Sequence, residues 1–329
     1  MFRTTLTAAL AASTFLGTAA LAQEMPGEGT TVRPVIGLIA EEYFQSRILF
    51  RALEDLGYEV AEPLETEIQT AHLAVGTGDG DFYPIHWGNL HQAFFNESGG
   101  DDVLEKVGPF VEGMLQGYLV DKASYDAGVT NLGDLADAEV AARFDADGDG
   151  KADLAGCVPG WGCERIIEHQ LSEYGLLDTV SHNQGAYNAI IADSMARHGN
   201  GDAILYYTWT PYWVSGALVP GEDVEWLEVP HTSLPDGVEV NTTFNGKNLG
   251  FAVDSMYVLT TDDFVAENPA AAKLFEVARL DVNDISAQNK LMADGEDSSD
   301  DIDRHVDEWI AAHQADYDGW LDAARAAAQ

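Results

Sequence analysis

Both cysteines of this chain lie in one short loop, GCVPGWGCE at residues 156–164. Cys157 and Cys163 enclose five residues, and two cysteines in an exported chain most simply form one disulfide. A bridge that closes so short a loop stabilises the fold by only about 2 kcal/mol through chain entropy. We therefore expect it to fix the local shape of the loop rather than to hold the whole fold together.

The same loop carries groups that are suited to binding a small anion. Gly160 and Gly162 allow the backbone to turn tightly and to approach a ligand closely. An amphipathic helix is predicted at 164–174, and the first N–H groups of a helix have no partner within it. The backbone N–H groups of Gly162 and Cys163 are therefore candidates to bind a carboxylate.

Three tryptophans lie where a ligand is expected. Trp87 follows the strand-like segment DFYPI, Trp209 follows AILYY, and Trp161 stands in the cysteine loop. Each alone is compatible with core packing, but three at such places favour a shared aromatic cage. Aromatic faces attract a quaternary ammonium ion, which has no N–H to donate, by roughly 0.5–2 kcal/mol per desolvated contact. A cage beside a carboxylate-binding turn suits a small zwitterion.

His91, four residues after Trp87, is a candidate for one further hydrogen bond to the ligand, although a lone histidine is more often structural. Catalytic motifs find little support, because the chain has no nucleophile elbow, zinc-protease helix or Walker loop. His86 and His91 are five apart, a poor spacing for two metal ligands on one helix face. We expect no enzyme, no metal and no cofactor; a secreted hydrolase that uses His91 with an acidic partner is the alternative.

An acidic segment, DADGDGKAD at 145–153, matches the first nine positions of a calcium-binding loop. The twelfth position is Gly156, where such a loop has a bidentate glutamate. Two interpretations stay open: a structural calcium site, and an acidic turn whose aspartates accept hydrogen bonds from their own backbone.

Strand-like and helix-like segments alternate along the chain, which predicts an α/β fold with mostly parallel sheets flanked by helices. In such folds ligands bind at the carboxyl ends of strands. Strands are predicted at 31–39, 58–60, 81–85, 117–120, 203–207 and 250–259. Helices are predicted at 41–56, 164–174, 187–196 and 270–280, and from 302 onward.

The N-terminal segment 1–22 has the pattern of a secretory signal peptide: Arg3, an apolar run and a small-x-small site at Ala20–Ala22. Residue 23 is not the cysteine of a lipoprotein, so we expect a freely diffusing periplasmic protein without a lipid anchor. The formal charge of −40 opposes binding to nucleic acid or anionic membranes. Acidic residues are spread along the whole chain, which favours solubility in a salty medium as their role.

Several segments together resemble the periplasmic glycine betaine/proline betaine-binding proteins of ProU-type ABC importers, the ProX family. They are RALEDLGYEV, HWGNLH, FDADGDGKADLAGC, PGWGCE, HNQGAY, YYTWTPYWVS, NPAAAKLF and HVDEWIAAHQ. The resemblance covers nearly the whole chain after the signal segment. It implies a two-lobe periplasmic binding protein of type II, with the ligand in the cleft between the lobes.

The resemblance also implies an organisation and a set of site residues. Lobe 1 would comprise 23–122 with 251–329, and lobe 2 would comprise 123–250, with a hinge near 122 and 250. The cage and the carboxylate site would be formed by Trp87, His91, Trp161, Gly162, Cys163 and Trp209.

The implied function is osmoprotectant uptake by a monomer that hands glycine betaine or proline betaine to a membrane permease and its ATPase subunit. Alternatives are a receptor for choline, carnitine, trimethylamine N-oxide or dimethylsulfoniopropionate, and a calcium-dependent structural module.

Overall fold

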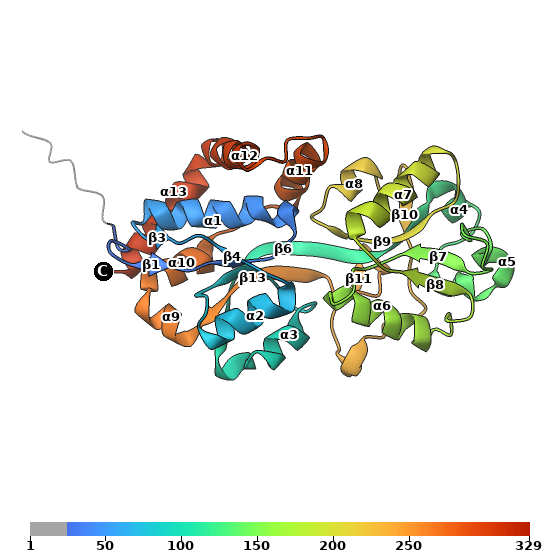
Figure 1. The fold of residues 1–329 in the computed structure, drawn as a ribbon, viewed down its shortest axis with the longest axis horizontal. Coiled ribbons are helices and arrows are strands. Elements are labelled where there is room, and N and C mark those ends of the chain that lie inside the picture. The colour runs from blue at the N-terminus through green and yellow to red at the C-terminus, as the bar shows by residue number, and fades with distance from the viewer. Residues whose placement is uncertain (1–24) are drawn as a thin grey trace, which may run out of the picture.

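The structure is a computed structural model that describes residues 25–329, and its elements form two lobes (Figure 1). The predicted signal peptide at 1–22 lies outside the described residues. The lobes are joined by the long strand β6 (Leu104–Asp121) and by β13 (Asp254–Thr261), which run side by side through the middle of the molecule.

A mixed sheet extends through both lobes in the order β5-β13-β6-β9-β7-β8, with β10 paired to β6. Its other strands are β5 (Tyr83–Trp87), β7 (Ala152–Ala155), β8 (Val180–Asn183), β9 (Leu205–Thr210) and β10 (Val224–Trp226). The predicted α/β class with flanking helices is confirmed. The sheet is mixed rather than mostly parallel, because the chain leaves the first lobe on β6 and returns on β13 in the opposite direction.

Strand β6 is shared between the lobes. Leu104 to Met114 lie opposite β13, whereas Leu115 to Val120 lie opposite β9. Both pairings are antiparallel, while β7 pairs in parallel with β8 and β9. One continuous strand therefore supports the inner edge of each lobe.

Helices cover the sheet in both lobes. The first lobe contains α1 (Tyr43–Asp55), α2 (Ile68–Thr77), α3 (Gln92–Glu97), α9 (Asp262–Glu267), α10 (Pro269–Val277), α11 (Val282–Ala293), α12 (Ser299–Ala312) and α13 (Gln314–Ala327). The second lobe contains α4 (Lys122–Asp126), α5 (Ala138–Ala141), α6 (Gly162–Glu173), α7 (Tyr187–Gly199) and α8 (Val214–Ala217). The predicted helix from 302 onward is two helices, which are separated at His313.

Short elements complete the fold. The small strand pairs are β1 (Thr31–Val32) with β3 (Glu59–Val60), β2 (Val35–Ile36) with β4 (Leu64–Glu65), and β11 (Thr243–Phe244) with β12 (Lys247–Asn248). Single 3-10 turns occur at Ala40–Glu42, Gly100–Asp102, Leu132–Ala136 and Pro235–Gly237. The predicted strand 31–39 is therefore two short strands, and a 3-10 turn precedes α1. Within residues 25–329 no helix is both long enough and apolar enough to span a bilayer.

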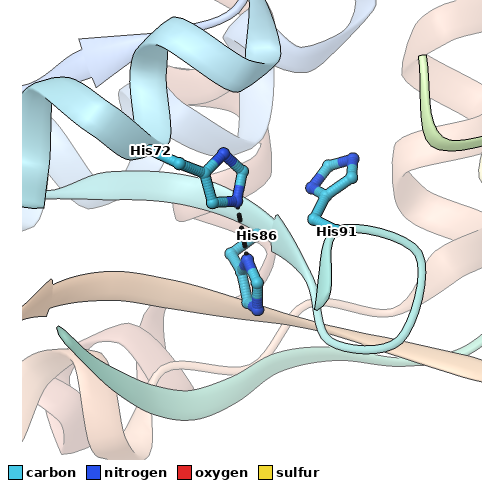
Figure 2. A group of neighbouring side chains, drawn as sticks. All are labelled: His72, His86 and His91. Atoms are coloured by element: carbon cyan, nitrogen blue, oxygen red, sulfur yellow. Dashed lines mark hydrogen bonds between the residues drawn. The ribbon is translucent and has the colours of Figure 1, made fainter. Parts of the chain in front are cut away.

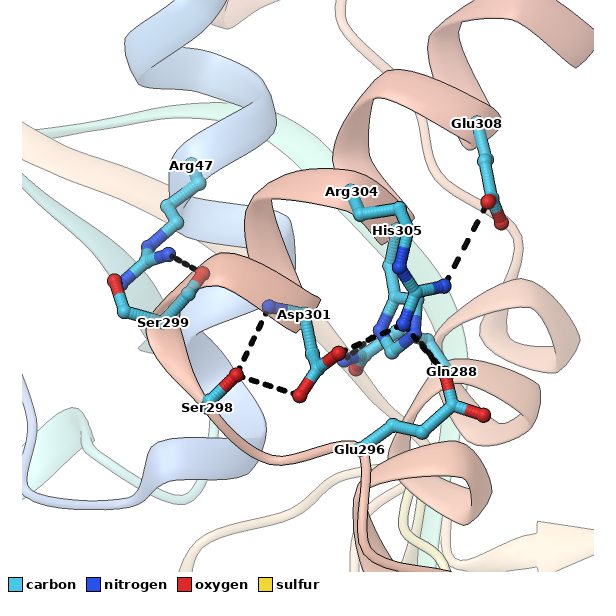
Figure 3. A network of polar contacts seen from close by, with 9 residues as sticks. All are labelled: Arg47, Gln288, Glu296, Ser298, Ser299, Asp301, Arg304, His305 and Glu308. Atoms are coloured by element: carbon cyan, nitrogen blue, oxygen red, sulfur yellow. Dashed lines mark hydrogen bonds and ion pairs between the residues drawn. The ribbon is translucent and has the colours of Figure 1, made fainter.

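A polar network ties the C-terminal helices to α1 (Figure 3). Arg47 of α1 donates to the Ser299 carbonyl at 2.8 Å, and Arg304 of α12 donates to Glu296 at 2.6 Å and to Asp301 at 2.8 Å. His305 donates through Nε2 to the same Glu296 at 3.0 Å. Arg304 pairs with Glu296 and Asp301 at the same time. Such a network orders an exposed acidic surface more effectively than isolated ion pairs would.

Candidate ligand-binding site

All six predicted site residues line one small cavity of about 30 Å³ between the lobes. The full lining is Ile39, Glu42, Ile68, Trp87, Leu90, His91, Gln116, Trp161, Gly162, Cys163, Tyr207 and Trp209. A wider groove of about 280 Å³ lies beside it and shares Leu90, Gln116 and Gly162. The aromatic and N–H groups that suit a zwitterion lie in the smaller cavity, so we take that cavity as the site.

Each lobe contributes aromatic rings to the cavity. Trp87 ends strand β5 of the first lobe, and Trp209 lies in strand β9 of the second. The Trp161 and Trp209 rings meet edge to face, with centroids 5.7 Å apart at 74°. Tyr212 and Tyr187 pack on Trp209 at centroid distances of 4.2 and 4.7 Å. These tyrosines restrict the rotamer of Trp209, so one wall of the cavity is preformed.

Trp209 lies inside its strand rather than in the loop after it. The sequence AILYY suggested an end at residue 207, but β9 continues to Thr210 because its residues pair with Leu115 to Val120 of β6. The side chain of Trp209 nevertheless lines the cavity. Trp209 therefore lies where a ligand-facing tryptophan was predicted, but the strand does not end before it, as the prediction had assumed.

The cysteine loop presents the free end of α6 to the cavity. The predicted disulfide joins Cys157 and Cys163, and the helix begins at Gly162. The backbone N–H groups of Gly162 and Cys163 donate to no residue in the described part of the chain. Glu164 accepts the Gly160 N–H at 2.6 Å, which holds the turn. Two adjacent helix-start N–H groups facing a cavity form a site that suits a carboxylate.

His91 is held as a hydrogen-bond donor. The Nδ1 atom of His91 accepts the backbone N–H of Trp87 at 3.2 Å, and the backbone N–H of His91 donates to the Trp87 carbonyl at 3.0 Å. Burial lowers the pKa of His91 well below its usual value, and the neighbouring His72 and His86 lower it further. A neutral imidazole whose Nδ1 accepts a bond carries its proton on Nε2, which can therefore donate to an anion in the cavity.

Asp254, at the start of β13, holds the loop that carries Trp87 and His91. Its carboxylate accepts the backbone N–H of Asn89 at 3.0 Å, that of Leu90 at 3.0 Å and the Asn89 side chain at 3.1 Å. Burial raises the pKa of Asp254, while these donors act in the opposite direction. Asp254 lies 165 residues from Asn89. No local sequence signal pointed to this role.

Two further histidines lie beside His91 (Figure 2). His72 Nδ1 donates to the Ile68 carbonyl at 2.7 Å, and His72 Nε2 accepts from His86 Nδ1 at 2.9 Å. Nitrogen atoms of all three rings lie within 4.8 Å of one another. A transition metal could bind all three rings only if the bond between His72 and His86 were broken. Burial lowers the pKa of His72 to about 4, and we interpret the pair as neutral polar packing.

Six lining residues were missed by sequence reasoning, and three of them are polar: Glu42, Gln116 and Tyr207. Tyr207 donates to the Gln116 side-chain carbonyl at 2.7 Å, so these two polar lining residues bond to each other. Gln116 lies in the middle of β6 among apolar residues. A polar residue within a buried strand was the one signal that could have indicated it.

The acidic segment at 145–153 forms a turn between α5 and β7. Asp145 accepts the N–H of Gly148 at 2.7 Å, and Asp147 accepts that of Asp149 at 2.9 Å. Carboxylate oxygens of Asp145, Asp147 and Asp149 lie within 4.8 Å of one another. The aspartates thus bond their own backbone, as the acidic-turn interpretation expects, and the calcium interpretation stays a prediction.

Comparisons with known proteins agree on one family. The family model described as the substrate-binding domain of ABC-type glycine betaine transport systems matches residues 30–312. The chain is 48% identical to the glycine betaine-binding periplasmic protein OusX of Dickeya dadantii (strain 3937) over 326 residues, 98% of each chain. It is 47% identical to the glycine betaine/proline betaine-binding periplasmic protein of Escherichia coli (strain K12) over 321 residues, 97% of each chain.

Solved structures share the fold at lower identity. Lactococcal OpuAC, in its closed conformation with glycine betaine, matches with a TM-score of 0.67 at 19% identity, over 89% of this chain and 99% of its own. A choline-binding protein of an ABC transporter, in complex with choline, matches with a TM-score of 0.70 at 18% identity, over 91% of this chain and 96% of its own. These likenesses support the two-lobe architecture.

Proposed function

The chain belongs to the family of substrate-binding domains of ABC-type glycine betaine transport systems, and from this premise we propose that it captures glycine betaine or proline betaine. The bound solute is delivered to an ABC permease and its ATPase subunit. The protein acts in the periplasm as a monomer, without a lipid anchor, and returns its solute unchanged rather than acting as an enzyme.

One observation carries the proposal. Three tryptophans, two unpaired helix-start N–H groups and a neutral histidine donor line the same cavity. The tryptophans Trp87, Trp161 and Trp209 bind the trimethylammonium group, and Gly162, Cys163 and His91 bind the carboxylate. The tryptophan contacts contribute roughly 0.5–2 kcal/mol each. Choline has no carboxylate to occupy the second half of the site, so betaines are favoured over it.

The lobe boundaries belong to the same proposal: 23–122 with 251–329 as one lobe, and 123–250 as the other. The change of partner along β6, between Met114 and Leu115, supports a first crossing slightly before 122. The second crossing lies just before Asp254, where β13 begins. Ligand contacts to both lobes favour the closed arrangement, and a hinge motion closes the lobes around the solute.

The test is a calorimetric titration of the mature protein with glycine betaine, with choline in parallel. We expect saturable binding of the betaine and weak binding of choline. Trp161→Ala should weaken betaine binding by at least about tenfold while the protein stays folded. Trp309→Ala, outside the cavity, is the matched control and should bind normally. Absence of betaine binding, or normal binding by Trp161→Ala, would contradict the proposed site.

A further inference from the structure

Glu42 is the sole acidic residue among the described residues that line the cavity. It lies at the start of α1, and it also lines a second small cavity, which shares Trp87 and Trp209 with the first. The residue as a whole is partly buried, but its Oε2 atom is fully buried and has no hydrogen-bond partner. The carboxyl group of Glu42 therefore lies beside the aromatic rings without a protein group to satisfy it.

Within residues 25–329, no cationic side chain lines either cavity to balance this carboxyl. Neither cavity has a lysine or arginine among its described lining residues. The ionisable groups that face Glu42 are Glu41 in the same turn, Tyr43 at the start of α1, Tyr83 on β5 and His91 across the cavity. An ionised carboxylate without a partner is costly to bury, so a state in which Glu42 is charged requires a cation from outside the chain.

We propose that the ligand's quaternary ammonium group is this cation, and that Glu42 is ionised and pairs with it in the loaded site. The inference rests on the proposed function and adds a specificity residue to it. Glu42 and the tryptophans hold the cationic end, while Gly162, Cys163 and His91 hold the carboxylate end. The two ends of the cavity thus differ in charge preference, which sets the orientation of a zwitterion.

The pairing links solute binding to proton release. Burial, together with the negative charge of Glu41, raises the pKa of Glu42 to about 8 in the absence of a ligand. Glu42 is then protonated at neutral pH. A cation beside the carboxyl favours the charged form and lowers the pKa, so binding below about pH 8 releases a proton from Glu42 to solvent. Affinity should therefore increase as pH approaches 8 and then become constant.

Other groups facing the cavity do not reproduce this dependence. The pKa of His91 lies well below its usual value because of burial, and the pKa of Tyr83 lies well above its usual value for the same reason. Neither changes its charge between about pH 6.5 and 8. The proton that is released in this range is therefore assigned to Glu42.

The experiment is calorimetric titration of the full mature protein with glycine betaine, in buffers of different ionisation enthalpy, at about pH 6.5 and about pH 9. Wild type should release up to about one proton per betaine at the lower pH and none at the higher pH. Glu42→Gln should release none at either pH and should bind at least about tenfold more weakly at pH 9. Glu54→Gln, on an exposed part of the same helix, is the control and should match wild type.

A second ligand keeps the test independent of folding defects in the variant. In 3,3-dimethylbutanoate a carbon atom replaces the nitrogen of glycine betaine, so the shape is kept and the positive charge is removed. Glu42→Gln should weaken betaine binding but leave binding of this analogue unchanged or improved. Equal losses for both ligands, or proton release that persists in Glu42→Gln, would overturn the role of Glu42 alone. Absence of betaine binding to wild type would overturn the proposed function as well.

Discussion

Gly162 at the start of α6 lies directly against Leu90 of the opposite lobe. A Cβ atom on Gly162 would lie 2.7 Å from the Leu90 carbonyl oxygen and 2.9 Å from its Cγ atom. The contact joins the turn that presents the carboxylate-binding N–H groups to the loop that carries Trp87 and His91. Because no methyl group fits at this point, the absence of a side chain on Gly162 is a requirement of the closed arrangement.

Gly162→Ala should therefore impair closure without unfolding the protein. The clash lies between the lobes and involves a backbone oxygen, which has little freedom to move aside. We expect betaine affinity to decrease by about tenfold or more, equivalent to about 1.4 kcal/mol, with a small change in the free energy of unfolding of the ligand-free protein. Calorimetry and urea unfolding measure the two effects separately.

Gly199→Ala is the matched control for this substitution. Gly199 ends helix α7, and a Cβ atom there would have no heavy atom within 4 Å. The control should keep full affinity and gain about 0.4–1 kcal/mol of stability through the unfolded state. Equal affinity for Gly162→Ala and wild type would show that the lobes close without this contact.

Asp254→Asn should loosen the loop between Trp87 and His91. The carboxylate accepts the N–H groups of Asn89 and Leu90, and an amide has one acceptor oxygen in place of two. We expect a loss of about 1–3 kcal/mol in the free energy of unfolding and weaker betaine binding, because His91 loses its fixed orientation. Urea unfolding and ligand titration provide the readouts. Asp193→Asn, on the exposed face of α7, should change neither.

Removing the disulfide should weaken betaine binding as well as lower stability. The double variant Cys157→Ser and Cys163→Ser should lose about 2 kcal/mol of unfolding free energy, as expected for a short loop. Cys163 also contributes a backbone N–H to the proposed carboxylate site, so a loosened loop should reduce betaine affinity by about tenfold or more. If the oxidised protein and the double variant bind betaine equally, the bridge does not shape the site.

The free energy of unfolding of the ligand-free protein should depend on pH because Glu42 titrates differently in the folded and unfolded states. Its pKa is raised from 4.5 to about 8 in the folded protein. At pH values below both pKa values the group is protonated in both states and contributes nothing. Between about pH 4.5 and 8 the unfolded chain loses its proton first, so the unfolding free energy decreases as pH increases, by at most about 1.4 kcal/mol per pH unit.

Glu42→Gln has no proton to lose at this position and should show a flatter dependence. Unfolding of the ligand-free protein in urea, at about pH 5 and about pH 8, measures the difference in slope. The variant should be close to wild type at the lower pH and more stable than wild type at the higher pH. Parallel curves for the two proteins would show that Glu42 titrates as an ordinary exposed carboxyl.

Local chemistry accounts for what could be predicted from the sequence. Cys157, Gly160, Gly162 and Cys163 fall within seven residues, so a constrained turn before a helix was predictable from residue types alone. Trp87, Trp161 and Trp209 were identified because an aromatic ring near a strand end or in a glycine loop requires either burial or a ligand. The α/β class followed from the alternation of apolar periodicities.

Tertiary structure decided everything that depends on distant segments. Asp254 meets Asn89 because β13 pairs antiparallel with β5, where Met256 lies opposite Trp87, and this pairing joins residues with no local signal for each other. Glu42 faces the cavity because α1 begins there, although its neighbouring residues resemble an ordinary amphipathic helix. The contact between Gly162 and Leu90 exists only when the two lobes meet. Residue types therefore determined which groups could bind a zwitterion, whereas strand pairing and lobe closure decided which groups share its cavity, because such contacts depend on the path of the whole chain.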